Sequence, residues 1–132
     1  MSKILLDTNA YTGLLRGNED VLGSIQKSSE VLFSVVVIGE LLSGFKGGSK
    51  EKENIDIMNE FIEMKKVNVV QITIKTSYIF GGIKNYLKRK GKPMPINDVW
   101  IAANSYEHQA ELITYDRHFA QIPKIKTWSI LK

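Results

Sequence analysis

The segment Ile4-Leu5-Leu6-Asp7-Thr8-Asn9 shows the kind of unit from which the chain is built. Three consecutive apolar residues are typical of a buried strand, and the Asp-Thr-Asn that follows is typical of a helix cap. In an open parallel sheet, the carboxyl ends of the strands and the starts of the following helices share one edge, where ligands bind. The segment therefore places Asp7 at the expected ligand-binding edge.

The same alternation of apolar runs and amphipathic stretches continues along the chain. Strands are predicted over residues 4–6, 31–33, 67–72 and 112–114, with 125–128 as a candidate fifth. Helices are predicted from the cap at Asp7 to Leu15, from about Asn18 through Ile25, over 38–45, from Ser49 to about Lys66, over 79–87, and from about Asn97 through Tyr106. This order predicts an α/β fold with helices on both faces of a mostly parallel sheet of four to five strands.

Length and composition favour one packed domain over residues 1–132, since the chain has 132 residues and is 43% hydrophobic. It has no cysteine, which excludes disulfides, thiol catalysis and zinc-finger ligation and fits a reducing compartment. No run approaches the ~20 apolar residues that span a membrane. The apolar run that stops at Asp7 is too short for a signal peptide. We expect a cytoplasmic protein with no membrane partner.

The net charge of +4 is unevenly distributed along the chain. Residues 1–66 carry 8 Lys/Arg against 10 Asp/Glu, whereas residues 67–132 carry 10 against 4, so the two halves have charges of −2 and +6. The densest basic run comprises Lys84, Lys88, Arg89, Lys90 and Lys92. Such a run suits a polyanion whose phosphates approach an acidic pocket, and it equally suits a solvated helix C terminus.

Four acidic residues follow apolar runs or lie near helix starts: Asp7, Glu40, Asp98 and Asp116. Local roles as a helix cap, a first-turn charge and a turn residue are alternatives for Asp7, Asp98 and Asp116. Glu40 is harder to explain locally, because its helix is apolar along much of its circumference. Two unit charges about 4 Å apart repel by roughly 4 kcal/mol at an effective dielectric near 20. A bound Mg²⁺ or Mn²⁺ would offset this repulsion, which suggests a metal-dependent phosphodiesterase.

Four motifs together resemble a known family: Ile4-Leu5-Leu6-Asp7-Thr8-Asn9, Val37-Ile38-Gly39-Glu40-Leu41-Leu42-Ser43-Gly44, Pro95-Ile96-Asn97-Asp98-Val99-Trp100-Ile101-Ala102-Ala103 and Leu112-Ile113-Thr114-Tyr115-Asp116-Arg117-His118-Phe119. In this order they resemble a PIN domain, and more narrowly a VapC-type toxin ribonuclease of a toxin–antitoxin pair. The resemblance covers the whole chain. It implies a three-layer α/β/α sandwich and Mg²⁺- or Mn²⁺-dependent endonucleolytic cleavage of RNA by metal-activated water.

The resemblance also implies that catalysis and the binding of one or two ions fall to four acids, Asp7, Glu40, Asp98 and Asp116. The place of Asp116 is often Asp and sometimes Asn in the family. Thr8 and Thr114 match small polar positions beside the metal site. Tyr115 is a departure, because members often carry Asn or Arg there, and it bears on access to the pocket and on substrate preference.

Partners implied by the resemblance are an RNA substrate, a second copy of the chain in a homodimer, and a cognate VapB-like antitoxin. The C-terminal segment of such an antitoxin wraps the toxin and can place a basic side chain among the acids. Apolar residues of the early helices either form that groove or belong to the core, namely Tyr11, Leu14, Leu15 and Phe45. The sequence leaves this choice open.

Two other functions compete with this interpretation. A haloacid-type phosphatase also places an aspartate after its first strand, but it needs a second aspartate where Asn9 stands. A catalytically inactive PIN-like RNA-binding module is the other alternative, and the presence of all four acids counts against it. The two histidines, His108 and His118, are too few and too separated to predict a metal cluster. His118 is a candidate phosphate contact because it lies two residues after Asp116, but a surface or packing role is favoured for it.

Overall fold

A sheet of four parallel strands lies at the centre of the protein. The structure is a computed structural model that describes residues 2–128 and 130. In this part of the chain the strand order is β3-β2-β1-β4, with β1 (Lys3–Leu6), β2 (Glu30–Ser34), β3 (Val67–Val70) and β4 (Glu111–Ile113). Leu5 pairs with Leu32 of β2 on one side and with Leu112 of β4 on the other, so β1 is a central strand.

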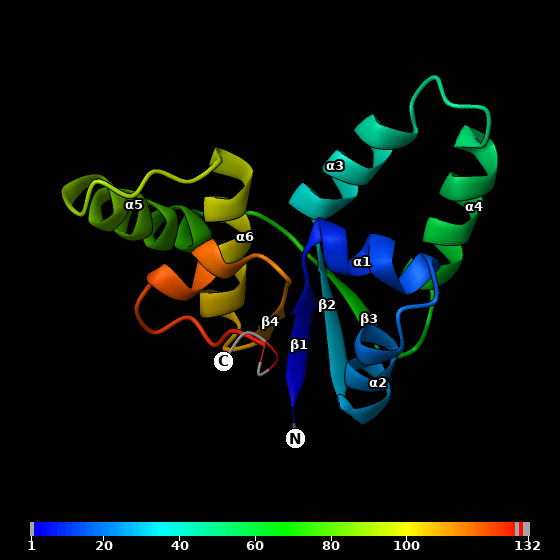
Figure 1. The fold of residues 1–132 in the computed structure, drawn as a ribbon, viewed down its shortest axis with the longest axis horizontal. Helices are drawn as coiled ribbons and strands as arrows, with labels where there is room; N and C mark the ends of the chain where they lie inside the picture. Colours follow the sequence, from blue (N-terminus) through cyan, green and yellow to red (C-terminus); the bar gives the residue numbers. More distant parts are fainter. Residues whose placement is uncertain (1, 129, 131–132) are drawn as a thin grey trace.

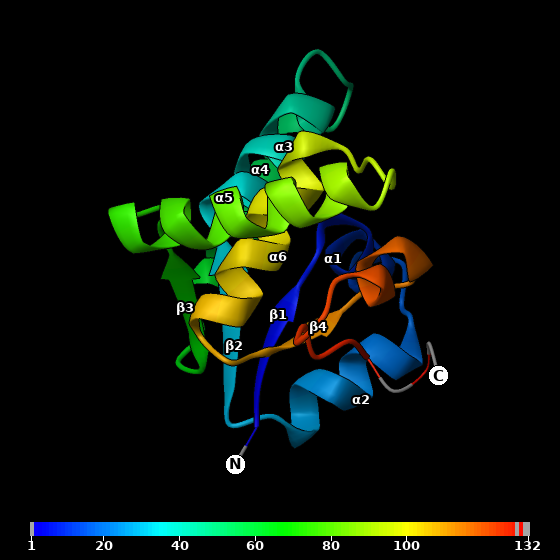
Figure 2. The ribbon, with the colours of Figure 1, turned by 90° about the vertical axis from the view of Figure 1, so that its left-hand side faces the viewer.

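Helices cover both faces of this sheet, as Figure 1 shows. Their bounds are α1 (Thr8–Leu15), α2 (Glu19–Lys27), α3 (Val35–Phe45), α4 (Glu51–Ile62), α5 (Ile74–Arg89), α6 (Ile96–Glu107) and the 3-10 turn η1 (Arg117–Gln121). Helices α1 to α4 lie on one side of the strands, and α5 and α6 lie on the other (Figures 1 and 2). The predicted α/β/α sandwich with a parallel sheet is confirmed.

Several predicted boundaries differ from the structure. The helix predicted over 79–87 begins earlier, at Ile74, and ends at Arg89. The candidate fifth strand is only an isolated bridge between Leu112 and Thr127, because Lys124 takes a positive φ of 68° that turns the chain just before it. The helix expected from Ser49 to Lys66 begins at Glu51 without a side-chain cap and ends at Ile62. A turn closed by Val67 N–H and the Met64 carbonyl then returns the chain to β3, which ends at Val70 rather than at residue 72.

An aromatic cluster joins the sheet to the helices of one face. The Phe33 ring on β2 lies 5.2 Å from the Tyr11 ring on α1 and 5.1 Å from the Phe61 ring on α4. Tyr11 is 0% exposed, so it is a core residue and not part of an exposed apolar groove. Leu15 is exposed instead, and Leu14 is only half-buried. Leu22 on α2 is exposed as well.

The carboxyl ends of the strands place polar residues along one edge of the sheet. Asp7 follows β1, Ser34 ends β2 and caps α3, and Thr114 follows β4. The backbone N–H of Asp7 donates to the Ile113 carbonyl, which holds the ends of β1 and β4 together. This edge is the one at which the sequence predicts a site. None of the helices that the structure describes has the length and apolar character needed to cross a bilayer.

Candidate active site

Asp7 is a buried carboxylate at the carboxyl end of β1. It is 5% exposed, and its Oδ1 atom accepts from Ala10 N at 2.8 Å, which caps α1. The side chain of Thr114 donates a second hydrogen bond to it. The local role as a helix cap and the position at the sheet edge therefore coexist, because the same strand end begins the helix.

Asp98, Asp116 and His118 form a compact group beside Asp7. One ligand atom from each of the three lies within 4.8 Å of the others. His118 Nε2 is 3.0 Å from Asp98 Oδ2, and His118 Nδ1 is 3.0 Å from Asp116 Oδ1. Asp98 comes from the first turn of α6, whereas Asp116 and His118 come from the start of η1. An imidazole that is protonated on both nitrogens donates to both carboxylates.

Glu40 projects from α3 and is held by residues of two other helices. Thr8 Oγ1 donates to Glu40 Oε1 at 2.5 Å, and Asn97 Nδ2 donates to Glu40 Oε2 at 3.3 Å. Since Thr8 directly follows Asp7 and Asn97 directly precedes Asp98, these bonds tie Glu40 to the segments that carry the other acids. The structure thus brings all four predicted acids to one region, although the atoms of Asp7 and Glu40 do not belong to the 4.8 Å group.

Burial and neighbouring charges shift the pKa values of two acids of the cluster, Asp7 and Asp98. Burial raises the pKa of Asp7 above its usual value, and the charges of Asp98 and Asp116 raise it further, against the hydrogen bonds from Thr114 and Ala10. Burial also raises the pKa of Asp98, and so do the charges of Glu40 and Asp116, while His118 lowers it. Ionised at neutral pH, these carboxylates cost folding free energy that a bound cation would recover.

Acidification is expected to stabilise the cation-free protein relative to a variant that lacks these two carboxyls. The folded-state pKa values of Asp7 and Asp98 are raised above 3.8, so the folded state binds more protons than the unfolded state in the window above 3.8. These two groups contribute most to the free energy of unfolding below pH 3.8, and this contribution is lost as the pH rises through their folded-state pKa values. Urea unfolding without divalent ions, from pH 7 down to pH 4, measures this slope, which should be smaller for Asp7→Asn/Asp98→Asn. Equal slopes would contradict the assigned shifts.

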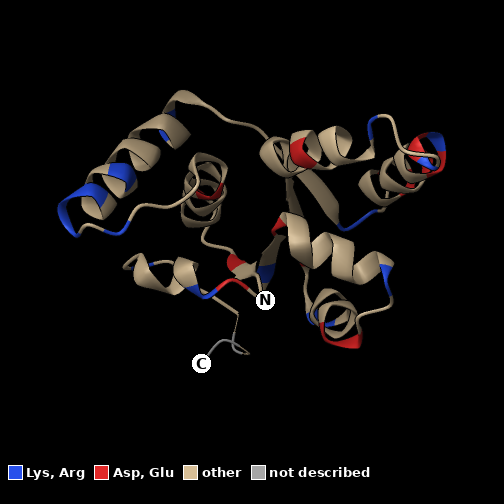
Figure 3. Cartoon of the chain, turned by 45° about the horizontal axis from the view of Figure 1, so that its top comes forward, with Lys and Arg blue, Asp and Glu red and all other residues tan. Residues whose placement is uncertain are grey.

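The roles of two residues of this site are not predicted from the sequence. His118 was expected to be a surface or packing residue, but it bridges Asp98 and Asp116. Its only sequence signal is its place two residues after Asp116. Asn97 has no assigned role in the sequence, yet it binds Glu40. The basic run at the end of α5 lies apart from the acids that Figure 3 shows near the centre of the molecule.

The donor set fits a divalent cation. The site combines crowded carboxylate oxygens with one imidazole, and Mg²⁺ and Mn²⁺ favour oxygen ligands, while Mn²⁺ also accepts imidazole. Asp7 adds a buried carboxylate whose neighbours Asp98 and Asp116 carry the same negative charge. The identity and number of the ions stay predictions, as does the assignment of all four acids as ligands.

This chain is similar to proteins of one known family. The PIN domain family model matches residues 4–125. A protein named Ribonuclease VapC1 from Haemophilus influenzae (strain R2866) is 25% identical over 127 residues, which cover 92% of this chain and 93% of that protein.

Two solved structures share the fold. The VapBC-1 structure from nontypeable Haemophilus influenzae matches with a TM-score of 0.86 and 24% identity, over 98% of this chain and 99% of the other. The structure of VapBC2 from Rickettsia felis bound to a DNA fragment from its promoter matches with a TM-score of 0.85 and 21% identity, over 96% and 97%. Both matches span nearly the whole chain.

Proposed function

The chain belongs to the PIN domain family, and from this premise we propose that it is a metal-dependent endoribonuclease acting as the toxin of a VapBC-type pair. The cluster of Asp7, Asp98 and Asp116 with His118 carries the proposal, because it offers charged oxygen ligands at the ligand-binding edge of the sheet. The ribonuclease name of the Haemophilus relative supports RNA as the substrate.

The residues of the site have separate roles in this reaction. Asp98 and Asp116 would hold one Mg²⁺ or Mn²⁺ ion, and Asp7 lies beside them to share that ion or a second one. When bound, such ions stabilise charge on phosphate oxygens and lower the pKa of water. Glu40, oriented by Thr8 and Asn97, is placed to accept a proton from the attacking water. His118 keeps the carboxylates of Asp98 and Asp116 aligned.

A direct test is incubation of the purified protein with total cellular RNA, with Mn²⁺, with Mg²⁺ or with a chelator. We expect discrete new RNA ends that appear only with the divalent ion, and mapping of these ends would identify the substrate. RNA that stays intact with either ion would contradict the proposal. Phosphate trapped covalently on Asp7 would instead favour the phosphatase alternative.

The antitoxin partner is part of the same proposal. The neighbouring structures are VapBC complexes, which supports a VapB-like partner for this chain. Apolar side chains that remain exposed on the early helices offer a surface for it, namely Leu15 on α1 and Leu42 on α3. Co-expression with the product of an adjacent short reading frame should suppress RNA cleavage. A homodimer is likewise proposed, and sedimentation measures it.

Replacing His118 with Gln is expected to weaken Mn²⁺ binding about tenfold, because side chains that orient metal ligands typically contribute 10- to 100-fold to affinity. The imidazole lies 3.0 Å from Asp98 and from Asp116, and loss of both contacts frees the two carboxylates. Isothermal titration with Mn²⁺ measures the change. His108→Gln is the matched control, since His108 lies next to Glu107 at the far end of α6. Tighter binding by His118→Gln would show that the imidazole competes with the cation.

A further inference from the structure

A polar groove runs along α1 and has no role in the reaction described above. It has a volume of about 400 Å³ and is lined by Asn9, Thr12, Gly13, Arg16, Gly17, Asn18 and Tyr115. One wall is a face of α1 with the turn that follows it, and the other is Tyr115. Asn9 lies two residues after Asp7, and Tyr115 directly precedes Asp116, so the chain segments that carry these two acids also contribute to the groove.

We propose that this groove binds the nucleotide next to the scissile phosphate of an RNA substrate, with its base stacked on Tyr115 and its phosphate held by Arg16. This inference rests on the proposed nuclease function and adds to it the residues that select the cut position. It also gives a role to Tyr115, the residue that departs from the family pattern.

Tyr115 is held in place from two sides. Its hydroxyl accepts a hydrogen bond from Asn18 Nδ2 at 2.6 Å, and its ring packs edge-on against Trp128 with centroids 5.0 Å apart. The Asn18 side chain is itself fixed, because its Oδ1 atom caps α2 through Asp20 N and Val21 N. Tyr115 nevertheless remains 41% exposed. An aromatic ring that is ordered before binding loses little entropy when a base stacks on it.

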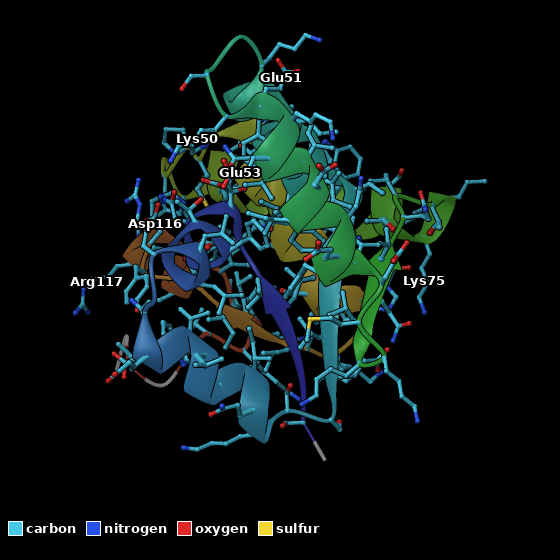
Figure 4. All side chains as sticks on the ribbon, turned by 90° about the vertical axis from the view of Figure 1, so that its right-hand side faces the viewer. Lys50, Glu51, Glu53, Lys75, Asp116 and Arg117 are labelled. Atoms are coloured by element: carbon cyan, nitrogen blue, oxygen red, sulfur yellow. The ribbon has the colours of Figure 1, made fainter. Side chains whose placement is uncertain are left out.

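Charge in the groove suits a phosphate. Arg16 is the only charged residue among those that line it, and Asn9, Thr12 and Asn18 add neutral hydrogen-bonding groups. The guanidinium of an arginine binds phosphate through two parallel hydrogen bonds. Along α1, Asn9 and Arg16 are about 10 Å apart at the usual helical rise, so Arg16 reaches a phosphate beyond the one at the acids. Figure 4 shows Arg117, from the same segment as Tyr115, projecting outward beside Asp116.

This lining favours RNA over a protein segment. Tyr115 is the only large apolar side chain in the groove, whereas protein anchors usually fill deep apolar pockets. Stacking on one ring is open to a base only when it is unpaired, so the substrate should be a single-stranded or loop region.

The test compares the wild type with Tyr115→Ala, Tyr115→Phe and Arg16→Gln on short single-stranded RNA of random sequence with Mn²⁺. Tyr115→Ala should raise KM about tenfold, the lower part of the range for loss of one base stack, and leave kcat within about twofold. It should also flatten the base preference on one side of the cut. Tyr115→Phe keeps the ring and should keep the preference, whereas Arg16→Gln should raise KM and reduce the salt dependence of binding. Tyr78→Ala is the control, because Tyr78 is 81% exposed outside this groove.

Anisotropy of the same RNA, labelled and bound in the presence of a chelator, separates this inference from the nuclease proposal. If the wild type cuts nothing, the nuclease proposal fails, and weaker RNA binding by Tyr115→Ala and Arg16→Gln would still support the groove. Unchanged binding, KM and base preference in both variants would overturn the groove proposal. Unchanged RNA binding with weaker retention of a co-expressed antitoxin would assign the groove to protein recognition and also overturn it. Arg16 is exposed, so its variant tests the groove without disturbing packing.

Discussion

Replacing Asp7 with Asn should abolish metal-dependent RNA cleavage and at the same time make the cation-free protein more stable. Burial and the charges of Asp98 and Asp116 raise the pKa of Asp7, so its ionised form costs folding free energy at neutral pH. Asn removes that charge and keeps an oxygen that accepts from Ala10 N, so the cap of α1 remains. Asn also removes a negative charge that would bind the cation. If the transition state loses about 4 kcal/mol of stabilisation as a result, kcat falls roughly 10³-fold.

Two measurements on the same protein check this expectation. Cleavage with Mn²⁺ gives kcat, and urea unfolding with a chelator gives the free energy of unfolding. Asp56→Asn is the matched control, because Asp56 makes a surface ion pair with Lys52 on α4 and its side chain is 56% exposed. Activity of Asp7→Asn near the wild-type level would end the assignment of Asp7 to the site. Lower stability than the wild type would show that its carboxylate is compensated in the fold.

Replacing Phe33 with Ala is expected to lower the free energy of unfolding by about 3–5 kcal/mol, the usual range for removal of a buried phenyl ring. Phe33 is 0% exposed and packs its ring between Tyr11 of α1 and Phe61 of α4. The effect on the site is indirect, since Phe33 directly precedes Ser34, which caps the helix that carries Glu40.

Chemical denaturation of Phe33→Ala and Phe33→Leu measures this contribution. The leucine variant retains most of the apolar volume and should lose less than half as much stability. Ile74→Ala provides the surface control, because Ile74 is 79% exposed at the start of α5. A loss below about 1 kcal/mol in Phe33→Ala would mean that the core relaxes around the cavity.

Local sequence patterns predict the elements that carry the acids. Ile4 to Leu6 and Leu112 to Ile113 are short apolar runs, and each leads into a polar residue that the structure places at the carboxyl end of a strand. The period of Leu41 and its neighbours likewise predicts α3. Such patterns work because burial on both faces of a parallel sheet demands an unbroken apolar strand.

Other features depend on distant contacts. Tyr11 and Leu22 look equally apolar in the sequence, yet Tyr11 is buried by Phe33 and Phe61 while Leu22 faces solvent. The expected strand at 125–128 is reduced to one bridge, because β4 offers only three residues for pairing and the chain turns at Lys124. The burial of a side chain depends on how the helices pack together, and a short segment of sequence does not contain that information.

The sequence alone determined the α/β alternation, the four acids and the edge at which they were expected. Only the tertiary structure decided that His118 lies between Asp98 and Asp116 and that Asn97 reaches Glu40. It also decided that Tyr115 faces α1 across a groove. The physical reason is that strand and helix propensities act over a few residues, whereas hydrogen bonds between side chains up to 97 positions apart form only after packing fixes both backbones.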